Sequence, residues 1–206
     1  MFAKYASLLT EKLNKQMNFS DEEKEIYEYG FELLLSIVVT MAIVVSISLI
    51  AGNAFYSISF FLFFFVPRLF IGGLHASSHL KCTIMTVATF IFTIIASGLL
   101  FCNRLKLITV LLSAASLFII CLFSPVINPN HPISENCYKK NRKISIILSF
   151  LCLFTVCYLI FKTQYIEIGI HSGVSFIAVS VLLIIEKFRK GENQQWKKSA
   201  RLFQHL

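Results

Sequence analysis

Six long apolar runs, each almost free of charged residues, constrain the fold of this chain of 206 residues more than any other feature. A helix needs about 17–25 apolar residues to cross the ~30 Å hydrocarbon layer of a bilayer. The hydrophobic share of 56% also exceeds the roughly 45–50% of an ordinary soluble domain. The runs lie at about 31–50, 54–70, 82–101, 105–123, 144–161 and 165–185.

The sequence therefore predicts an all-α, polytopic membrane protein with about six transmembrane helices and an N-terminal amphipathic helix. We expect one membrane domain over 1–206, in which 1–30 is interfacial, 31–185 holds the six spans and 186–206 is a tail. Ser20 and Glu23 fit a capping box, which predicts a helix that runs into the first span. Five apolar side chains before it approximate one face of a helix, between lysines: Phe2, Tyr5, Leu8, Leu9 and Leu13.

The basic residues predict the orientation of the spans. With six spans and the N-terminus inside, sixteen of the nineteen Lys and Arg residues fall on the cytoplasmic side. This excess follows the positive-inside rule, so both termini are expected in the cytoplasm. The net charge of +8 then reflects contact with lipid headgroups. Since the chain has no Gly-rich phosphate loop and no soluble basic domain, we expect no nucleic-acid partner.

The six cysteines do not predict disulfides, because no CxxC occurs and most of them lie in or beside apolar spans, where cysteine packs as a small hydrophobe. Ionisable residues are also scarce inside the spans. His171, near the start of the sixth run, is the exception, and we expect it to be interfacial.

The segment from Arg68 to Cys82 is the one that indicates chemistry. It is a polar interval between two spans and contains Gly72, Gly73, two histidines and Cys82. Cys82 opens the third span, so it is expected in the first turn of a helix, where the helix dipole and neighbouring Lys81 favour the nucleophilic thiolate. The two glycines allow backbone conformations that expose N–H groups.

Two histidines are candidates for the base that takes the thiol proton. In a straight helix His75 and Cys82 share a face but lie ~10.5 Å apart along the axis, so their pairing requires a bend or a helix that starts after His75. His79 is one turn from Cys82 and needs no bend. The three residues also have a spacing that suits zinc on one helical face, but the Glu of the HExxH motif is absent.

The segment resembles the accessory gene regulator B family. The matching features are Arg68 followed after six residues by His75-Ala76, the glycine pair before this histidine, and Cys82 seven residues after it. The resemblance extends to the chain length, the polar N-terminus, the number of spans and a Pro-rich basic loop after the fourth span.

This resemblance implies a bacterial membrane cysteine endopeptidase that cleaves a quorum-sensing precursor peptide at the cytoplasmic face. Cys82 would be its nucleophile and His75 its general base, with an acyl-thioester intermediate that is converted to a thiolactone or lactone. The implied partners are a short amphipathic precursor peptide, the lipid bilayer and a second copy of the chain, and no cofactor is expected. A peptide transporter and a non-catalytic membrane accessory protein remain the alternatives.

The remaining candidates in the segment have weaker support. Arg68 matches a recurrent arginine of the family and is a candidate substrate contact, although an interfacial anchor explains it equally well. Gly72, Gly73, Ser77, Ser78 and His79 are candidates for substrate or oxyanion contacts. No residues are assigned to a metal.

Overall fold

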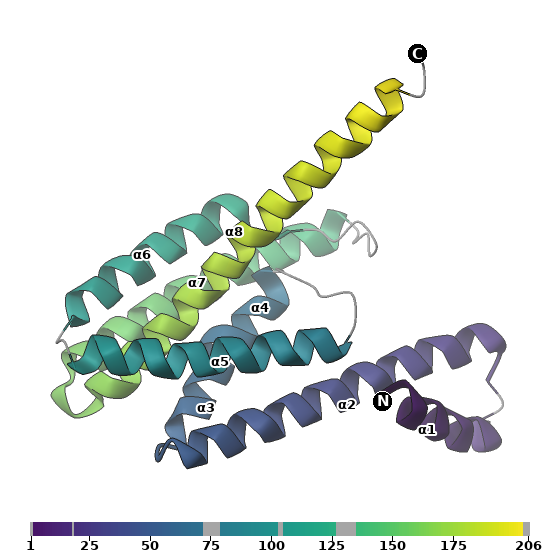
Figure 1. The fold of residues 1–206 in the computed structure, drawn as a ribbon, viewed down its shortest axis with the longest axis horizontal. Coiled ribbons are helices and arrows are strands. Elements are labelled where there is room, and N and C mark those ends of the chain that lie inside the picture. The colour runs from purple at the N-terminus through teal and green to yellow at the C-terminus, as the bar shows by residue number, and fades with distance from the viewer. Residues whose placement is uncertain (1, 18, 72–78, 103–104, 127–134, 204–206) are drawn as a thin grey trace. The chain divides into compact units, whose positions relative to one another are not determined.

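The computed structural model describes residues 2–17, 19–71, 79–102, 105–126 and 135–203, with side chains given up to Arg189 except those of Phe2 and Gln16 (Figure 1). The described residues form helices and no strands. The α-helices are α1 (Phe2–Met17), α2 (Asp21–Ile50), α3 (Phe55–Phe60), α4 (Val66–Ile71), α5 (His79–Cys102), α6 (Lys106–Phe123), α7 (Glu135–Phe161) and α8 (Ile166–Phe203), with a π-helix at Phe61–Phe65 and a 3-10 turn at Thr163–Tyr165.

Five of these helices are long and apolar enough to cross a membrane: α2, α5, α6, α7 and the first part of α8. The remaining predicted span, the second one at 54–70, corresponds to a shorter apolar helical segment, Phe55–Ile71. Many large apolar side chains on these helices are exposed, such as Phe154 at 73% and Leu111 at 70%, as expected for surfaces that face lipid. The predicted all-α, polytopic membrane fold is therefore confirmed.

The short segment Phe55–Ile71 changes its helical period before a proline. The π-helix Phe61–Phe65 joins α3 to α4, and Val66 N–H donates to the carbonyl of Phe61, five residues back. Pro67 follows directly and is buried. Proline lacks an N–H and its ring clashes with the carbonyl four residues earlier, so a wider turn at this point accommodates it.

The chain divides into two compact units, which we describe separately. Unit 1 comprises Met1–Ala54 and His75–Ile91, and unit 2 comprises Phe55–Leu74 and Phe92–Leu206. In unit 1, Ser20 caps α2: its hydroxyl accepts from Glu23 N–H, and the Glu23 carboxylate accepts from Ser20 N–H. This confirms the predicted capping box. Gly52, just after α2, has a φ of 81°, a conformation that glycine adopts without strain.

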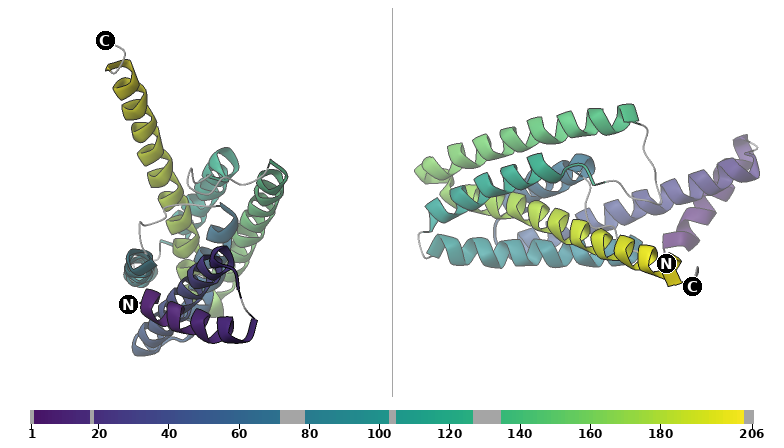
Figure 2. Two further views of the ribbon diagram at one scale, coloured as in Figure 1. Left: turned by 90° about the vertical axis from the view of Figure 1, so that its right-hand side faces the viewer. Right: turned by 90° about the horizontal axis from the view of Figure 1, so that it is seen from above.

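In unit 2, α8 is the helix that the others surround. In the apolar part of α8, 61% of the residues are buried, compared with 22–28% in the apolar parts of the other long spans. It packs against α3, α6 and α7 (Figures 1 and 2). Two hydrogen bonds link α3 to α8: Tyr56 bonds Glu167, and Ser59 bonds His171. Residue numbers rise together on both helices, so α3 and α8 run parallel.

The other two neighbours complete an alternating arrangement. On α6, Thr109 lies against Gly173 and Ser116 bonds Ser180, so α6 is also parallel to α8. On α7 the order is reversed, because Ile160 lies against Gly169 and Val156 against Gly173. The directions in unit 2 are therefore those that consecutive membrane crossings require.

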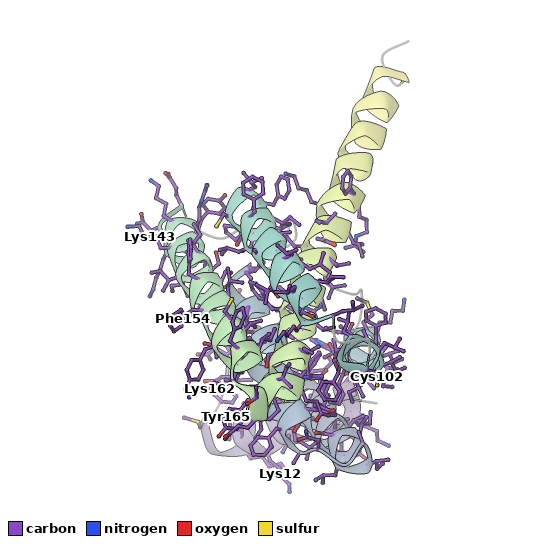
Figure 3. All side chains as sticks on the ribbon, turned by 90° about the vertical axis from the view of Figure 1, so that its left-hand side faces the viewer. Lys12, Cys102, Lys143, Phe154, Lys162 and Tyr165 are labelled. Carbon is purple, nitrogen blue, oxygen red and sulfur yellow. The ribbon has the colours of Figure 1, made fainter. Side chains whose placement is uncertain are left out.

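Figure 3 shows charged residues at the ends of α7 and an apolar middle. Lys143 lies toward one end, Lys162 follows the other, and Phe154 projects outward between them (Figure 3). Basic side chains at both ends of an apolar span can reach the headgroup layers, so this distribution suits a helix that crosses the bilayer.

His171 differs from its sequence-based expectation. It was expected at the interface, but its side chain is 0% exposed within unit 2. Its Nδ1 lies 2.6 Å from Ser59 Oγ, its Nε2 lies 3.4 Å from Thr93 Oγ1, and its ring stacks on Tyr56. These contacts join α8 to α3 and to the second half of α5, because a buried imidazole must find hydrogen-bond partners inside the protein.

Replacing His171 with phenylalanine is expected to destabilise the protein by about 1–3 kcal/mol, because the ring's hydrogen bonds to Ser59 and Thr93 are lost while its aromatic volume is kept. The check is the thermal midpoint of purified protein in detergent, followed by the monodisperse fraction in size-exclusion chromatography. Phe154→Leu, at a lipid-facing position, is the control and should leave the midpoint unchanged. Equal midpoints for His171→Phe and wild type would contradict the structural role.

Candidate functional site

Cys82 lies in the first turn of α5, as the sequence predicted. Its side chain is half-buried, and its neighbours Leu80 and Lys81 are exposed. The first N–H groups of a helix have no partner within it and carry a partial positive charge. Cys82 thus lies where a helix leaves N–H groups unpaired, and its side chain is partly accessible.

Hydroxyl groups fix the turn that carries Cys82. Thr83 is buried, and its Oγ1 lies 3.1 Å from Ser36 Oγ and accepts from Thr40 Oγ1 at 3.0 Å. Thr86 Oγ1 donates to the Cys82 carbonyl at 2.9 Å. These bonds hold the start of α5 against the middle of α2, so the position of the sulfur is set by side chains of both helices.

His79 is the described imidazole beside Cys82. It begins α5 and lies three residues before the cysteine, a spacing at which side chains on a helix are neighbours. Its ring packs on Tyr29 of α2, with centroids 5.4 Å apart and planes tilted by 56°. Its backbone carbonyl accepts from Ser36 Oγ at 3.5 Å. His79 therefore has a packing role between α2 and α5 as well as a place next to the thiol.

Arg68 lies in unit 2, on α4. Its guanidinium carbon is 5.4 Å from the centroid of the Phe64 ring one turn earlier, within the range of a cation–π contact. The side chain is half-buried. This contact fixes part of the side chain near the end of the short apolar segment, where an arginine can reach headgroups.

Five of the predicted site residues lie outside the described residues: Gly72, Gly73, His75, Ser77 and Ser78. The pairing of His75 with Cys82 therefore stays a prediction. Among the residues that the structure describes, no three His, Cys, Asp or Glu side chains are grouped as metal ligands would be. His75 is not among these residues, so its part in a zinc site stays a prediction.

A comparison with protein families decides what this chain is related to. The family model described as accessory gene regulator B matches residues 6–185, which include the whole of the Arg68–Cys82 segment. The chain belongs to the accessory gene regulator B family. The resemblance seen in the sequence is thereby confirmed.

Relatives of the accessory gene regulator B family match this chain over most of its length. A putative AgrB-like protein 1 of Clostridium perfringens strain 13 is 30% identical over 197 residues, 92% of this chain and 99% of the relative. A putative AgrB-like protein of C. perfringens strain SM101 is 26% identical, covering 89% and 87%. The accessory gene regulator protein B of Staphylococcus carnosus is 26% identical, covering 84% and 80%. No solved structure matched the chain.

The other five cysteines of this AgrB-family chain have different surroundings. All six are free thiols. Cys152 is buried in α7, and Cys102, Cys121 and Cys157 lie on membrane-spanning helices. Cys137 is exposed in the polar first turn of α7, near the ion pair of Glu135 with Lys139. Cys137 is thus an exposed thiol in polar surroundings, and Cys102, the last residue of α5, is exposed as well.

Sequence reasoning missed the residues of α2 that hold the Cys82 turn. Ser36 and Thr40 belong to one buried stripe of α2 in which every fourth residue is buried: Ser36, Thr40, Val44 and Ser48. The signal was present as small and hydroxyl residues four apart in an apolar run, a pattern typical of helix contacts in membranes. It identifies the face that packs, but not its partner helix.

Proposed function

We propose that this protein is a membrane cysteine endopeptidase that cleaves the C-terminal part of a quorum-sensing precursor peptide and promotes cyclisation of the product. The observation that carries the proposal is the place of Cys82: a half-buried thiol in the first turn of a helix, at the end of the segment that contains both candidate bases, His75 and His79. Membership of the accessory gene regulator B family supports it. Autoinducing-peptide processing is the biological role that follows from this assignment.

The chemistry proceeds in two acyl transfers. His75 takes the proton of the Cys82 thiol, the resulting thiolate attacks a backbone carbonyl of the precursor, and the imidazolium gives the same proton to the departing amine as the C–N bond breaks. The products are a thioester on Cys82 and a released C-terminal fragment. A cysteine or serine side chain of the precursor next attacks this thioester, which frees Cys82 and closes a thiolactone or lactone.

Exclusion of water decides between ring closure and hydrolysis. Exchange of one thioester for another is nearly balanced in bond energy, whereas hydrolysis of the thioester is favourable. Water that reached the intermediate would therefore hydrolyse it before the ring closes. A site at the lipid boundary limits access of water. An amphipathic precursor that lies on the same leaflet would bring its cleavage site to the depth of Cys82.

The site is assigned to the cytoplasmic face, with both termini in the cytoplasm. Two observations support this orientation. Alternating helix directions in unit 2 agree with consecutive crossings, and the basic residues are concentrated on one side of such a path. A homodimer is part of the proposal only through the family resemblance.

One observation favours the alternative function of a peptide transporter. His171 is fully buried in an apolar span, and ionisable residues inside spans often mark transport paths. Its partners Ser59 and Thr93 also explain it as a link between helices, which is why we prefer the peptidase. A transporter or an accessory protein would retain its function without the Cys82 thiol.

Mass spectrometry of the protein co-expressed with a short precursor peptide, encoded beside it, tests the proposal. We expect a cleaved C-terminal fragment, and a mass increase on Cys82 that equals the N-terminal part of the precursor less water. Iodoacetamide should abolish the fragment and EDTA should not. Loss of cleavage with EDTA but not with iodoacetamide would replace the thiol mechanism with a metal-dependent one.

A further inference from the structure

Helix α1 has two faces of different character. Ala6 and Thr10 are buried, at 1% and 0% exposure, and α1 packs against α2 within unit 1. A second face exposes three large side chains: Tyr5 at 55%, Leu8 at 50% and Leu9 at 40%. At about 100° per residue this exposed apolar face lies roughly a third of a turn from the packed one. Within unit 1, packing on α2 therefore leaves these three side chains exposed.

The position of α1 along α2 brings this face close to the bilayer. Helix α2 has 30 residues and is about 45 Å long, which exceeds the ~30 Å hydrocarbon layer. Its apolar run starts at Phe31, so its first ten residues extend beyond that layer. Figures 1 and 2 show α1 folded back along this extension, with its N-terminal end directed toward the middle of α2. Helix α1 thus lies beside the end of α2 that projects from the hydrocarbon layer.

The charges of the two helices are opposite. Three lysines of α1, all exposed, lie beside its apolar face: Lys4, Lys12 and Lys15. In contrast, five carboxylates crowd the extension of α2: Asp21, Glu22, Glu23, Glu25 and Glu28. An anionic surface repels the second group and attracts the first. Glu11 on α1 and Lys24 on α2 reduce this contrast but do not reverse it, so the hairpin is expected to approach such a surface through α1.

We propose that α1 binds anionic phospholipid headgroups, with Tyr5, Leu8 and Leu9 inserted at the acyl boundary and the three lysines on the phosphates. Each component has its usual role at an interface: the aromatic and aliphatic side chains at the acyl boundary, and the basic groups on the acidic lipids. Since α1 packs on the start of a membrane-spanning helix, it is already held at the surface that it binds. This inference does not depend on the peptidase chemistry.

Tryptophan fluorescence of the full chain in vesicles tests the proposal. The single native tryptophan is removed by Trp196→Phe, and Leu9→Trp places a reporter on the exposed face. Vesicles contain phosphatidylcholine alone, or phosphatidylcholine with one-third phosphatidylglycerol, each with and without brominated acyl chains. We expect a blue shift and strong bromine quenching with phosphatidylglycerol, and less of both without it. Lys4→Gln, Lys12→Gln and Lys15→Gln should each lower the ratio of bound to free α1 by about fivefold.

Matched lysines elsewhere provide the control. Lys106 and Lys162 are exposed at helix ends in unit 2, so Lys106→Gln and Lys162→Gln should leave the fluorescence response unchanged. Unaltered circular dichroism of each variant shows that the helices are intact. The proposal is wrong if the reporter responds equally to both lipid compositions. It is also wrong if the reporter stays unquenched until a precursor peptide is added, since α1 would then be a peptide-docking helix.

Discussion

Cys82→Ala is expected to abolish precursor cleavage, lowering its rate by several orders of magnitude, while the amount of membrane-inserted protein stays unchanged. The effect is large because the nucleophile forms the covalent intermediate, and no positioned thiol replaces it. Thr83 and Thr86, which fix the turn, are untouched by the substitution. The check is mass spectrometry of the co-expressed precursor together with quantification of the protein in membranes. Cys82→Ser should fail as well, since a serine hydroxyl is far less acidic than a thiol.

The roles of His75 and His79 can be distinguished with a variant that preserves the packing of His79. His79→Phe keeps an aromatic ring against Tyr29 but cannot transfer a proton, so we expect it to retain cleavage. His75→Ala is expected to abolish it. The opposite result, with His79→Phe inactive and His75→Ala active, would make His79 the base. If both variants remained active, the Cys/His mechanism would be wrong.

The remaining cysteines supply the control for the nucleophile. Alanine at Cys102, Cys121, Cys152 or Cys157 should leave cleavage intact, because these thiols lie on the spans. Cys137→Ala is the informative member of the set, since Cys137 is exposed and predicted to be on the same side of the membrane. If Cys137→Ala lost cleavage while Cys82→Ala remained active, the nucleophile would be Cys137 on α7.

The spans could be predicted from the sequence because their length and lack of charge reflect the thickness of the bilayer. Their polar ends could not. The fifth apolar run begins at Ile144, but α7 begins at Glu135, and α8 continues past Ile185 to Phe203. Lys, Arg and Glu are good helix formers, so a helix does not stop where its apolar part does. Hydropathy locates the hydrocarbon segment of a helix rather than the whole helix.

Features of the site that depend on neighbouring residues in the sequence could be predicted. Features that depend on contacts between helices could not. Cys82 was placed in a first turn because a polar interval meets an apolar run at that residue. The bonds of Thr83 to Ser36 and Thr40 join residues more than forty positions apart, which no local pattern specifies. His171 was misplaced at the interface for the same reason: its partner Ser59 lies on a different helix.

Gly169→Ala is expected to destabilise unit 2 by about 1–3 kcal/mol, through overpacking between α7 and α8. A Cβ at this position would lie 2.8 Å from the backbone nitrogen of Ile160 and 2.9 Å from the carbonyl carbon of Leu159. Backbone atoms inside a helix cannot move separately, so the two helices must move apart. The thermal midpoint of the purified protein in detergent should fall accordingly, and Gly169→Leu should lower it further.

Gly173 tests whether contact with side-chain atoms destabilises the protein less than contact with backbone atoms. A Cβ there would lie 2.5 Å from Cγ2 of Thr109 and 3.2 Å from Ser113 Oγ and Val156 Cγ1. The first distance is shorter than any at Gly169, but the atoms belong to side chains, which can shift without moving a helix backbone, although the β-branched Thr109 and Val156 have few rotamers to adopt. We therefore expect Gly173→Ala to be less destabilising than Gly169→Ala, despite the closer contact.

Gly98 is the matched control, since it lies within the membrane-spanning helix α5 and a Cβ there would meet nothing within 4 Å. Gly98→Ala should be neutral or slightly stabilising, because alanine has the higher helix propensity. The expected order of thermal midpoints is thus Gly98→Ala, then Gly173→Ala, then Gly169→Ala. A fall for Gly98→Ala as large as that for Gly169→Ala would mean that glycine serves helix flexibility in this protein. The close approach of α7 and α8 would then no longer explain why position 169 excludes a side chain.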